Sequence, residues 1–260
     1  MSKIVVSKTD GVATVRLNDP ASLNALSAPV AAELEQVIAD LSDDESVRAL
    51  VLTGTGRAFC AGGDVQSFYD HRDDPHDIMQ AVIEGLHGAV QRLIDAPFPT
   101  VAAINGVVAG AGMGIALATD MAIAAESAMF TMAYTGIGVS PDGSSTFFLP
   151  RLVGTRVAME MILTNKRVSS EEALALGIVN SVVPDGELPY EAANLAARLA
   201  VGPTRAYVRA RKLIRSSLGA DPFTQMESEA DGILAAGETK DFYEGVSAFI
   251  EKRPPTFTGT

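Results

Sequence analysis

The first twenty residues alternate between apolar and polar positions. Residues 12–17 read Val-Ala-Thr-Val-Arg-Leu, residues 3–8 form a second short stretch of similar pattern, and Asp10-Gly11 lies between them. Alternation with a period of two is typical of a half-buried strand, and Asp-Gly is a common two-residue hairpin turn. The pattern therefore predicts a β-hairpin at the start of the chain.

Apolar residues then recur at helical spacing. A helix is predicted from about Ser27, because Pro29 suits its first turn and apolar residues follow every three or four positions. These apolar residues are Val30, Leu34, Val37, Ile38 and Leu41. A second helix is predicted over residues 78–94, after a polar break at residues 70–77 that we expect to be solvated and mobile.

Two continuous apolar runs each precede a glycine-rich turn. Residues 47–53 come before Phe-Cys-Ala-Gly-Gly-Asp at 59–64, and residues 101–104 come before Gly-Ala-Gly-Met-Gly at 110–114. Continuous apolar runs of this length are typical of buried strands. We expect each turn to lead into a helix, which leaves unpaired backbone N–H groups at the helix N-terminus.

The second half of the chain continues this pattern and then changes. Short strands are predicted at residues 121–125 and 178–183. Between them, Ser169 and Glu172 have the spacing of a capping box, for a helix that Gly177 would end.

From about Tyr190 the pattern is helical throughout. The sequence therefore predicts an α/β core over residues 1–190, in which strand–helix turns form a spiral or layers. The helical region at 191–260 lacks a full core of its own, and we expect it to pack on a neighbouring subunit.

Composition narrows the class of protein. The chain has 260 residues, 47% of them apolar, so it can bury a sizeable core, and its net charge of −12 argues against a nucleic-acid partner. A single cysteine excludes an internal disulfide and suits a reducing cytoplasm.

The first residues do not have the pattern of a signal peptide. Residues 96–119 carry no charge, but their prolines, glycines and Asn105 favour buried core over a membrane span.

The two glycine turns also suggest chemistry. Backbone N–H groups from both turns, aimed at one point, would hold a carbonyl oxygen that becomes negative during a reaction, as in a thioester enolate. Taken alone, residues 110–114 would more often indicate close helix packing. They do not form a dinucleotide-binding motif, because Ile115 stands where the third glycine should be.

Seven short motifs stand in a specific order and spacing, at residues 23–26, 52–54, 58–64, 102–120, 149–154, 173–179 and 244–253. Together they resemble the crotonase, or enoyl-CoA hydratase/isomerase, superfamily along nearly the whole chain. The resemblance implies a spiral of ββα turns with a C-terminal helical trimerisation region. It also implies a homotrimer or a dimer of trimers, an acyl-CoA substrate, and neither a redox cofactor nor a metal.

The resemblance also implies which residues form the site. The N–H groups of Gly63 and Ala111 take the position of the two oxyanion-hole donors. Six further residues are expected to contact the substrate, the first three along the coenzyme A arm: Ala61, Asp64, Val65, Phe68, Gly112 and Tyr134. An ordinary core position is an equally good interpretation of Tyr134.

The chain departs from the family pattern at one important point. Hydratases of the family carry two catalytic glutamates, and by alignment these positions are Gly114 and Tyr134 here. Glycine has no side chain and tyrosine titrates near pH ~10, so neither residue can activate water at neutral pH. Ordinary two-glutamate hydration is therefore not expected.

A carboxylate at Asp142 offers another base. Pro141-Asp142-Gly143 is also a standard turn sequence, and without the resemblance a turn would be the preferred interpretation. The segment resembles enoyl-CoA isomerases that use a single aspartate, and a dehalogenase of 4-chlorobenzoyl-CoA whose aspartate is a nucleophile. We expect burial among three apolar side chains to raise the pKa of this carboxyl from ~3.9: Ile137, Phe147 and Phe148.

Three functions follow from these residues. The leading hypothesis is an isomerase that moves the double bond of an enoyl-CoA, or rearranges a ring-derived acyl-CoA, by proton transfer through Asp142. The second is an atypical hydratase or thioester hydrolase in which Asp142 positions water. The third is an inactive homologue that binds acyl-CoA or RNA, although the acidic composition argues against RNA.

The remaining reactive residues have simpler interpretations. Cys60 is expected to be a small buried residue, because no activating base lies near it in sequence. His71 and His76 stand among aspartates, and a hydrated acidic loop is a better interpretation than a metal site. His87 is expected to be structural or partly exposed on its helix.

Overall fold

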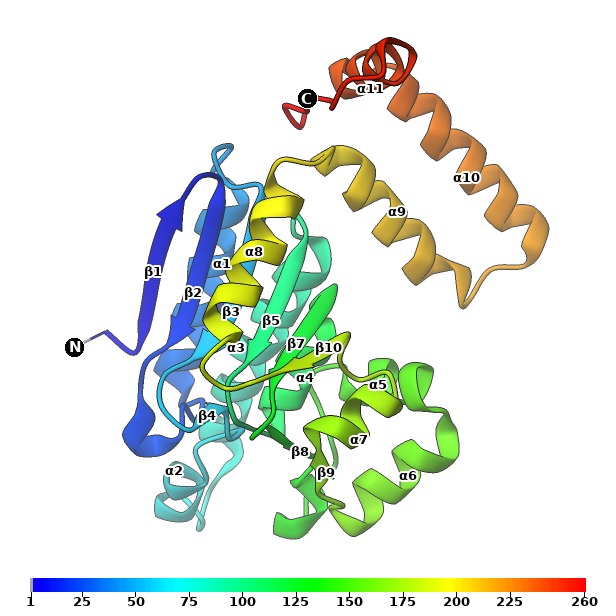
Figure 1. Cartoon of the computed structure of the whole chain (residues 1–260). Coiled ribbons are helices and arrows are strands. Elements are labelled where there is room, and N and C mark those ends of the chain that lie inside the picture. Colours follow the sequence, from blue (N-terminus) through cyan, green and yellow to red (C-terminus); the bar gives the residue numbers. More distant parts are fainter. Residues whose placement is uncertain (1) are drawn as a thin grey trace.

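The computed structural model describes residues 2–260 and begins with the predicted hairpin (Figure 1). Strands β1 (Ile4–Thr9) and β2 (Val12–Leu17) pair antiparallel around Asp10 and Gly11, which both have positive φ. Along β2 the buried residues are Ala13, Val15 and Leu17, as the alternation requires.

Two sheets form the core. The first has the order β1-β2-β3-β5-β7-β10, and the second has the order β4-β6-β8-β9. The further strands are β3 (Ala49–Gly54), β4 (Ala58–Cys60), β5 (Thr100–Ile104), β6 (Val107–Ala109), β7 (Met121–Ala125), β8 (Met129–Thr131), β9 (Val168–Ser169) and β10 (Ser181–Val183). Apart from the β1–β2 and β8–β9 pairs, neighbouring strands run parallel.

The order of the strands makes the fold a spiral. Three consecutive pairs, β3 with β4, β5 with β6 and β7 with β8, each give one strand to the first sheet and one to the second. The chain therefore passes repeatedly from one sheet to the other, which confirms the expected ββα spiral. The short strands of the second sheet were not predicted, because runs of three residues carry no usable period.

Helices connect the strands and cover the sheets. In the core they are α1 (Ala28–Ser42), α2 (Val65–Asp70), α3 (His76–Asp95), α4 (Ala111–Ala118), α5 (Ser145–Val153), α6 (Thr155–Thr164), α7 (Ser170–Ala175) and α8 (Leu188–Ala200), with short 3-10 helices η1 (Pro20–Ser22) and η2 (Tyr134–Ile137). The helix predicted from about Ser27 begins at Ala28, and the predicted cap is present at α7, where Ser169 Oγ accepts the Glu172 N–H. Gly177, with φ +76°, follows the end of α7.

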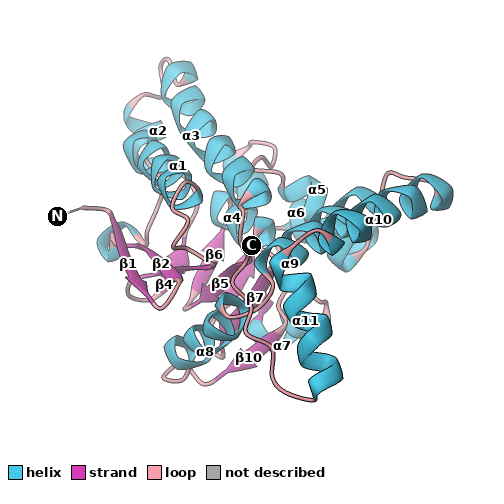
Figure 2. Cartoon of the chain, turned by 90° about the horizontal axis from the view of Figure 1, so that it is seen from above, coloured by secondary structure: helices cyan, strands magenta, loops and turns pink. Residues whose placement is uncertain are grey.

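The first sheet has a helical layer on each side. Figure 2 shows α8 on one side of the strands and α1 and α3 on the other. Alanines of α8 pack against Val51, Ala103 and Ile123 on one face, while α1, α3 and α4 close the larger core on the other. The uncharged segment 96–119 forms β5, β6 and α4 within that core, which confirms its interpretation as buried structure. None of the helices described in residues 2–260 is long and apolar enough to cross a membrane.

Three C-terminal helices leave this body. They are α9 (Thr204–Ser217), α10 (Pro222–Gly237) and α11 (Lys240–Glu251), and Figure 1 shows them extending away from the sheets. We call them the arm. The expected boundary at residue 190 falls inside α8, which packs on the first sheet, so the projecting segment begins later in the chain than expected.

Candidate active site

The two glycine turns lie side by side because the strands that lead into them are neighbours. Strands β4 and β6 pair parallel, and Gly62 and Gly110 follow their ends with φ of +102° and +51°. A Cβ on Gly62 would lie 3.0 Å from the Ala109 carbonyl oxygen and 3.5 Å from the Ala111 nitrogen. Any larger residue at position 62 would therefore combine unfavourable φ with close backbone contacts.

Both predicted donors have available N–H groups. Ala111 is the first residue of α4, so its N–H has no acceptor within the helix. Around Gly63, Leu26 donates to the Gly62 carbonyl and Asp64 donates back to the Leu26 carbonyl, which leaves out the Gly63 N–H. Within residues 2–260, neither N–H has a protein acceptor. Such donors can stabilise an oxyanion without reorganisation.

The residues expected along the coenzyme A arm lie at the start of α2. Asp64 is the N-cap of this helix, and its carboxylate accepts the Ser67 N–H at 3.3 Å. Val65 is exposed. The ring of Phe68 lies 3.2 Å from where a Cβ on Gly63 would stand, so Phe68 packs beside Gly63. Ala61 donates its N–H to the Leu23 carbonyl.

Gly112 has a clear packing role. A Cβ at this position would come within 2.3 Å of the Cys60 carbonyl oxygen, so only glycine lets α4 approach β4 this closely. Contact between Gly112 and substrate stays a prediction.

Asp142 reaches the same region through α4. A Cβ on Gly114 would lie 2.6 Å from the Gly143 carbonyl oxygen, and one on Gly143 would lie 3.2 Å from Leu86 of α3. Position 114 is one helical turn after Ala111. The loop that carries Asp142 therefore packs directly on the helix that begins at the second donor. Gly143 and Ser144 both have positive φ, which turns this loop into α5.

The carboxylate of Asp142 has two polar neighbours. The Tyr134 hydroxyl donates to Oδ1 at 2.6 Å, and Nε2 of His87 lies 3.7 Å from Oδ2. The Asp142 side chain is 26% exposed, so it is neither buried completely nor free in solvent. The structure corrects the fully apolar environment expected here, because Ile137 and Phe147 are 51% and 42% exposed, whereas Phe148 is partly buried against the core.

His87 is partly exposed on its helix, as expected, but sequence analysis missed its contact with the Asp142 loop. Its Nε2 accepts the Gly143 N–H at 3.3 Å, and this contact holds the loop next to Asp142. His87 and Gly143 are separated by 56 positions in the sequence. No local pattern on α3 indicates this contact, since it depends on how α3 packs against the loop.

The surroundings of Tyr134 and Cys60 raise the pKa values of both side chains. Burial, together with the adjacent Asp142 carboxylate, raises the pKa of Tyr134 far above its usual value, so its hydroxyl stays a donor at any working pH. Burial raises the pKa of the Cys60 thiol to about 12, which supports its interpretation as an inert buried residue.

The other histidines do not join this site. His71 lies in the exposed turn after α2, and His76 is the exposed first residue of α3. Across the part of the chain that the structure describes, no three His, Cys, Asp or Glu side chains are placed to hold a metal ion.

Comparison with known proteins agrees with this geometry. The profile of the family described as enoyl-CoA hydratase/isomerase matches residues 7–260. The chain is 38% identical to a 1,2-epoxyphenylacetyl-CoA isomerase of Escherichia coli, with all of both chains covered. It is 34% identical to 4-chlorobenzoyl coenzyme A dehalogenase-2 of an Arthrobacter species, covering 96% of this chain and 91% of that protein.

A solved structure shows the same fold. An enoyl-CoA hydratase from Bacillus anthracis superposes with a TM-score of 0.93 at 32% identity, with all of both chains covered. The spiral of ββα turns, the paired glycine turns and the end-to-end match lead to one conclusion: this chain belongs to the enoyl-CoA hydratase/isomerase family of the crotonase superfamily.

Proposed function

We propose that this enzyme moves the double bond of an enoyl-CoA, or rearranges a ring-derived acyl-CoA, with Asp142 as its single acid–base group. The observation that carries this proposal is the placement of Asp142, whose loop packs on α4 one turn from the Ala111 N–H. The close contact between Gly114 and Gly143 supports it further, because a glutamate at position 114 would require this loop to move.

The proposed mechanism needs two N–H donors and one carboxylate. The thioester carbonyl accepts hydrogen bonds from the Gly63 and Ala111 N–H groups. Asp142 then removes a proton alpha or gamma to that carbonyl, and the two donors stabilise the enolate oxygen. Asp142 returns the proton elsewhere on the conjugated chain. Since Tyr134 already donates to Oδ1, Oδ2 is the oxygen available for the transfer.

The proposal also specifies what the site binds. The acyl-CoA enters as substrate, and the proposed steps need neither a redox group nor a metal ion. Ala61, Val65 and Phe68 at the start of α2 would contact the thioester and the coenzyme A arm. Acyl-chain length is left open by these contacts.

A second candidate is supported by His87. A water molecule between the imidazole and Asp142 would have two groups able to accept its proton, which suits an atypical hydratase or a thioester hydrolase. The imidazole already accepts the Gly143 N–H through Nε2, so it would have to release that bond before acting as a base. We therefore place isomerisation first.

An isotope experiment separates these functions. A 3-enoyl-CoA is incubated with the enzyme in heavy water, and mass spectrometry follows deuterium uptake, water addition and free coenzyme A. Isomerisation predicts deuterium uptake and a moved double bond without addition of water. Hydration or hydrolysis instead of exchange would refute the isomerase proposal, and a bound but unchanged substrate would indicate an inactive homologue.

Asp142→Asn is the critical variant in this assay. We expect isomerisation to fall by about 10²–10⁴-fold, because the amide cannot accept the proton. The amide can still accept the Tyr134 hydrogen bond, so thermal unfolding should be unchanged. Wild-type turnover in Asp142→Asn would remove Asp142 from the mechanism.

We also propose that the protein assembles in the cytoplasm as a homotrimer or a dimer of trimers, and that the arm of each subunit packs on a neighbouring subunit. The largest apolar side chains of the arm are left uncovered within one chain, among them Phe223, Phe249 and Ile250, which are 72–82% exposed. Burying such residues on a second copy would remove apolar area from water.

A further inference from the structure

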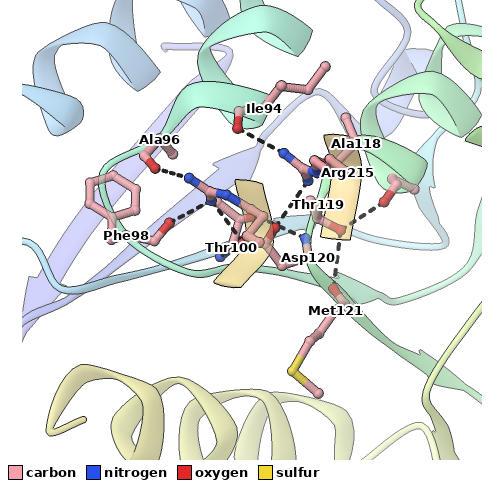
Figure 3. Close-up of polar contacts among 11 residues, drawn as sticks. Ile94, Ala96, Phe98, Thr100, Ala118, Thr119, Asp120, Met121 and Arg215 are labelled. Carbon is pink, nitrogen blue, oxygen red and sulfur yellow. Dashed lines mark hydrogen bonds and ion pairs between the residues drawn. The ribbon is translucent and has the colours of Figure 1, made fainter. Parts of the chain in front are cut away.

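A partly buried charge cluster joins the arm to the body, at the end of α4 opposite Ala111. Its members are Asp120, after the end of α4, and Arg211 and Arg215 of α9. Asp120 and Arg215 are labelled in Figure 3. Arg211 Nη1 and Arg215 Nη2 each lie 3.0 Å from a different oxygen of Asp120. The same carboxylate accepts the N–H and the hydroxyl of Thr100, at 2.9 and 3.1 Å.

The two arginines also hold the ends of two core helices. Arg215 donates to the Ile94 carbonyl near the end of α3, at 2.8 Å, and to the Ala118 carbonyl at the end of α4, at 2.9 Å (Figure 3). Arg211 donates to the carbonyls of Ala96 and Phe98, just after α3. The last carbonyls of a helix lack partners within it and carry partial negative charge, so they compensate the second positive charge.

Arg215 also reaches a third helix. Its guanidinium carbon lies 5.7 Å from the centre of the Phe148 ring on α5. Each of these three helices adjoins one group of the active site. The helix α3 carries His87, α4 begins at the Ala111 N–H, and α5 follows the loop of Asp142.

The path from Arg215 to the site is short and rigid. All eight residues of α4 are buried, and a helix of that length spans about 12 Å. Midway along α4, Gly114 contacts Gly143, and Leu86 of α3 contacts Gly143 as well. Because close-packed interiors transmit small displacements, a shift at Ala118 would be passed along α4 to the Ala111 N–H and to the loop that carries Asp142.

We propose that Arg215 is a positioning residue for the reaction: by holding the ends of α3 and α4 against α5, it sets the distance between the oxyanion donors and the Asp142 carboxylate. The proposal rests on the function proposed above. Misplacement of reacting groups by about 1 Å can cost roughly 10²-fold in rate. Loss of Arg215 should therefore lower kcat more than it weakens substrate binding.

Three variants test this role. Arg215→Met keeps the apolar stem and removes the charge and every donor, while Arg215→Lys keeps the charge but cannot reach two helix ends at once. Arg151→Met is the matched control. Arg151 lies over the Phe147 ring at 3.7 Å and donates to the Phe147 carbonyl within α5, so it also sits on α5 but does not hold α3 or α4.

The first readout does not require turnover. A saturated acyl-CoA with a ¹³C-labelled thioester carbonyl is bound to each variant, and infrared difference spectroscopy records its C=O stretch. Donation from Gly63 and Ala111 lowers this frequency relative to water. We expect Arg215→Met to lose at least half of that shift, Arg215→Lys to retain more of it, and Arg151→Met to match the wild type.

Kinetics and stability complete the test. We expect Arg215→Met to lower kcat at least tenfold with KM changed less than threefold, Arg215→Lys to recover part of the loss, and light scattering to show an unchanged assembly. A wild-type carbonyl band and kcat in Arg215→Met, with only its unfolding temperature lowered, would show that Arg215 merely anchors the arm. If Arg215→Met does not fold, Arg215→Lys decides by the same two readouts. A wild-type enzyme that binds no acyl-CoA would overturn the proposed function and this inference together.

Discussion

At the scale of single residues, Asp142 is notable for its two unequal oxygens. Oδ1 accepts a short hydrogen bond from Tyr134, whereas Oδ2 faces His87 at a distance too long for a direct hydrogen bond. A carboxylate held on one side keeps a fixed orientation and still has a free oxygen for proton transfer. This arrangement explains how one aspartate could serve as the base without a second carboxylate nearby.

The raised pKa of Tyr134 predicts a loss of stability at alkaline pH. The folded protein keeps this phenol protonated, whereas the unfolded chain releases the proton near pH ~10. Stability from this group is therefore complete below pH ~10 and falls above it, by up to about 1.4 kcal/mol per pH unit. Urea unfolding between pH 8 and pH 11 should show a shallower alkaline decline in Tyr134→Phe. Parallel curves for the two proteins would contradict this prediction.

Gly114 gives a second prediction at this scale. A Cβ at this position meets the backbone of Gly143 at 2.6 Å, which no side-chain rotation can relieve. We expect Gly114→Ala to lower the free energy of unfolding by about 1–3 kcal/mol and to reduce isomerisation, because the Asp142 loop must move. Gly237→Ala is the control, since nothing lies within 4 Å of a Cβ at that helical position. Chemical denaturation and initial rates measure both effects, and equal behaviour of the two variants would refute the packing argument.

At the scale of elements, α2 owes its position to its N-cap. Asp64 accepts the Ser67 N–H, and the helix it starts places Phe68 beside Gly63. The resemblance assigned Asp64 to substrate binding, whereas the structure shows a capping contact. These two roles make different predictions, because asparagine is as good an N-cap as aspartate but carries no charge.

The comparison of Asp64→Ala with Asp64→Asn separates the two roles. If capping dominates, Asp64→Ala loses about 1 kcal/mol of stability and raises KM for acyl-CoA, while Asp64→Asn behaves as wild type. Thermal unfolding and steady-state kinetics test this expectation. An equal rise of KM in both variants would instead show that the carboxylate charge acts on the substrate directly.

At the scale of the whole molecule, the arm is the part that a single chain leaves incomplete. It is anchored to the body by Arg211 and Arg215, yet α10 has no buried residue. The orientation of the arm and the spacing of the site thus share one set of contacts. If the arm packs on another copy, the contacts of Arg211 and Arg215 would connect the subunit interface to the helices that carry the active site.

The proposed assembly depends on these exposed apolar residues. We expect Phe249→Asp to shift the protein from trimers toward monomers, because a charge on that surface opposes burial. Multi-angle light scattering measures the mass directly, and Glu227→Gln on α10 is a control that leaves the apolar surface intact. An unchanged mass in Phe249→Asp would exclude this part of the arm from the interface.

Much of the fold could be predicted from local patterns. The hairpin, α1, α3 and the strands β3, β5 and β7 lie within two or three residues of their predicted bounds, because each spans enough residues to show a period. The strands of the second sheet could not be predicted. They are too short to show a pattern, and pairing with one another is what makes them strands.

Some features of the candidate site could likewise be predicted from the sequence, and others could not. The two glycine turns could be found from local patterns, because tight turns require glycine and helix starts expose N–H groups, whereas the roles predicted for Gly63, Ala111 and Asp142 came from the family resemblance. The environment of Asp142 was predicted wrongly, since polar contacts with Tyr134 and His87 replace the expected apolar wall. Those contacts join α3, η2 and a loop, which no local window contains.

The sequence alone determined the class of fold, the two glycine turns and the family, since these depend on residue types that backbone geometry demands at fixed spacing. Only the tertiary structure decided which oxygen of Asp142 is free, why Gly114 must lack a side chain, and that Arg215 holds three site-bearing helices together. These facts depend on contacts between residues far apart in the chain, and close packing rather than local preference sets such contacts.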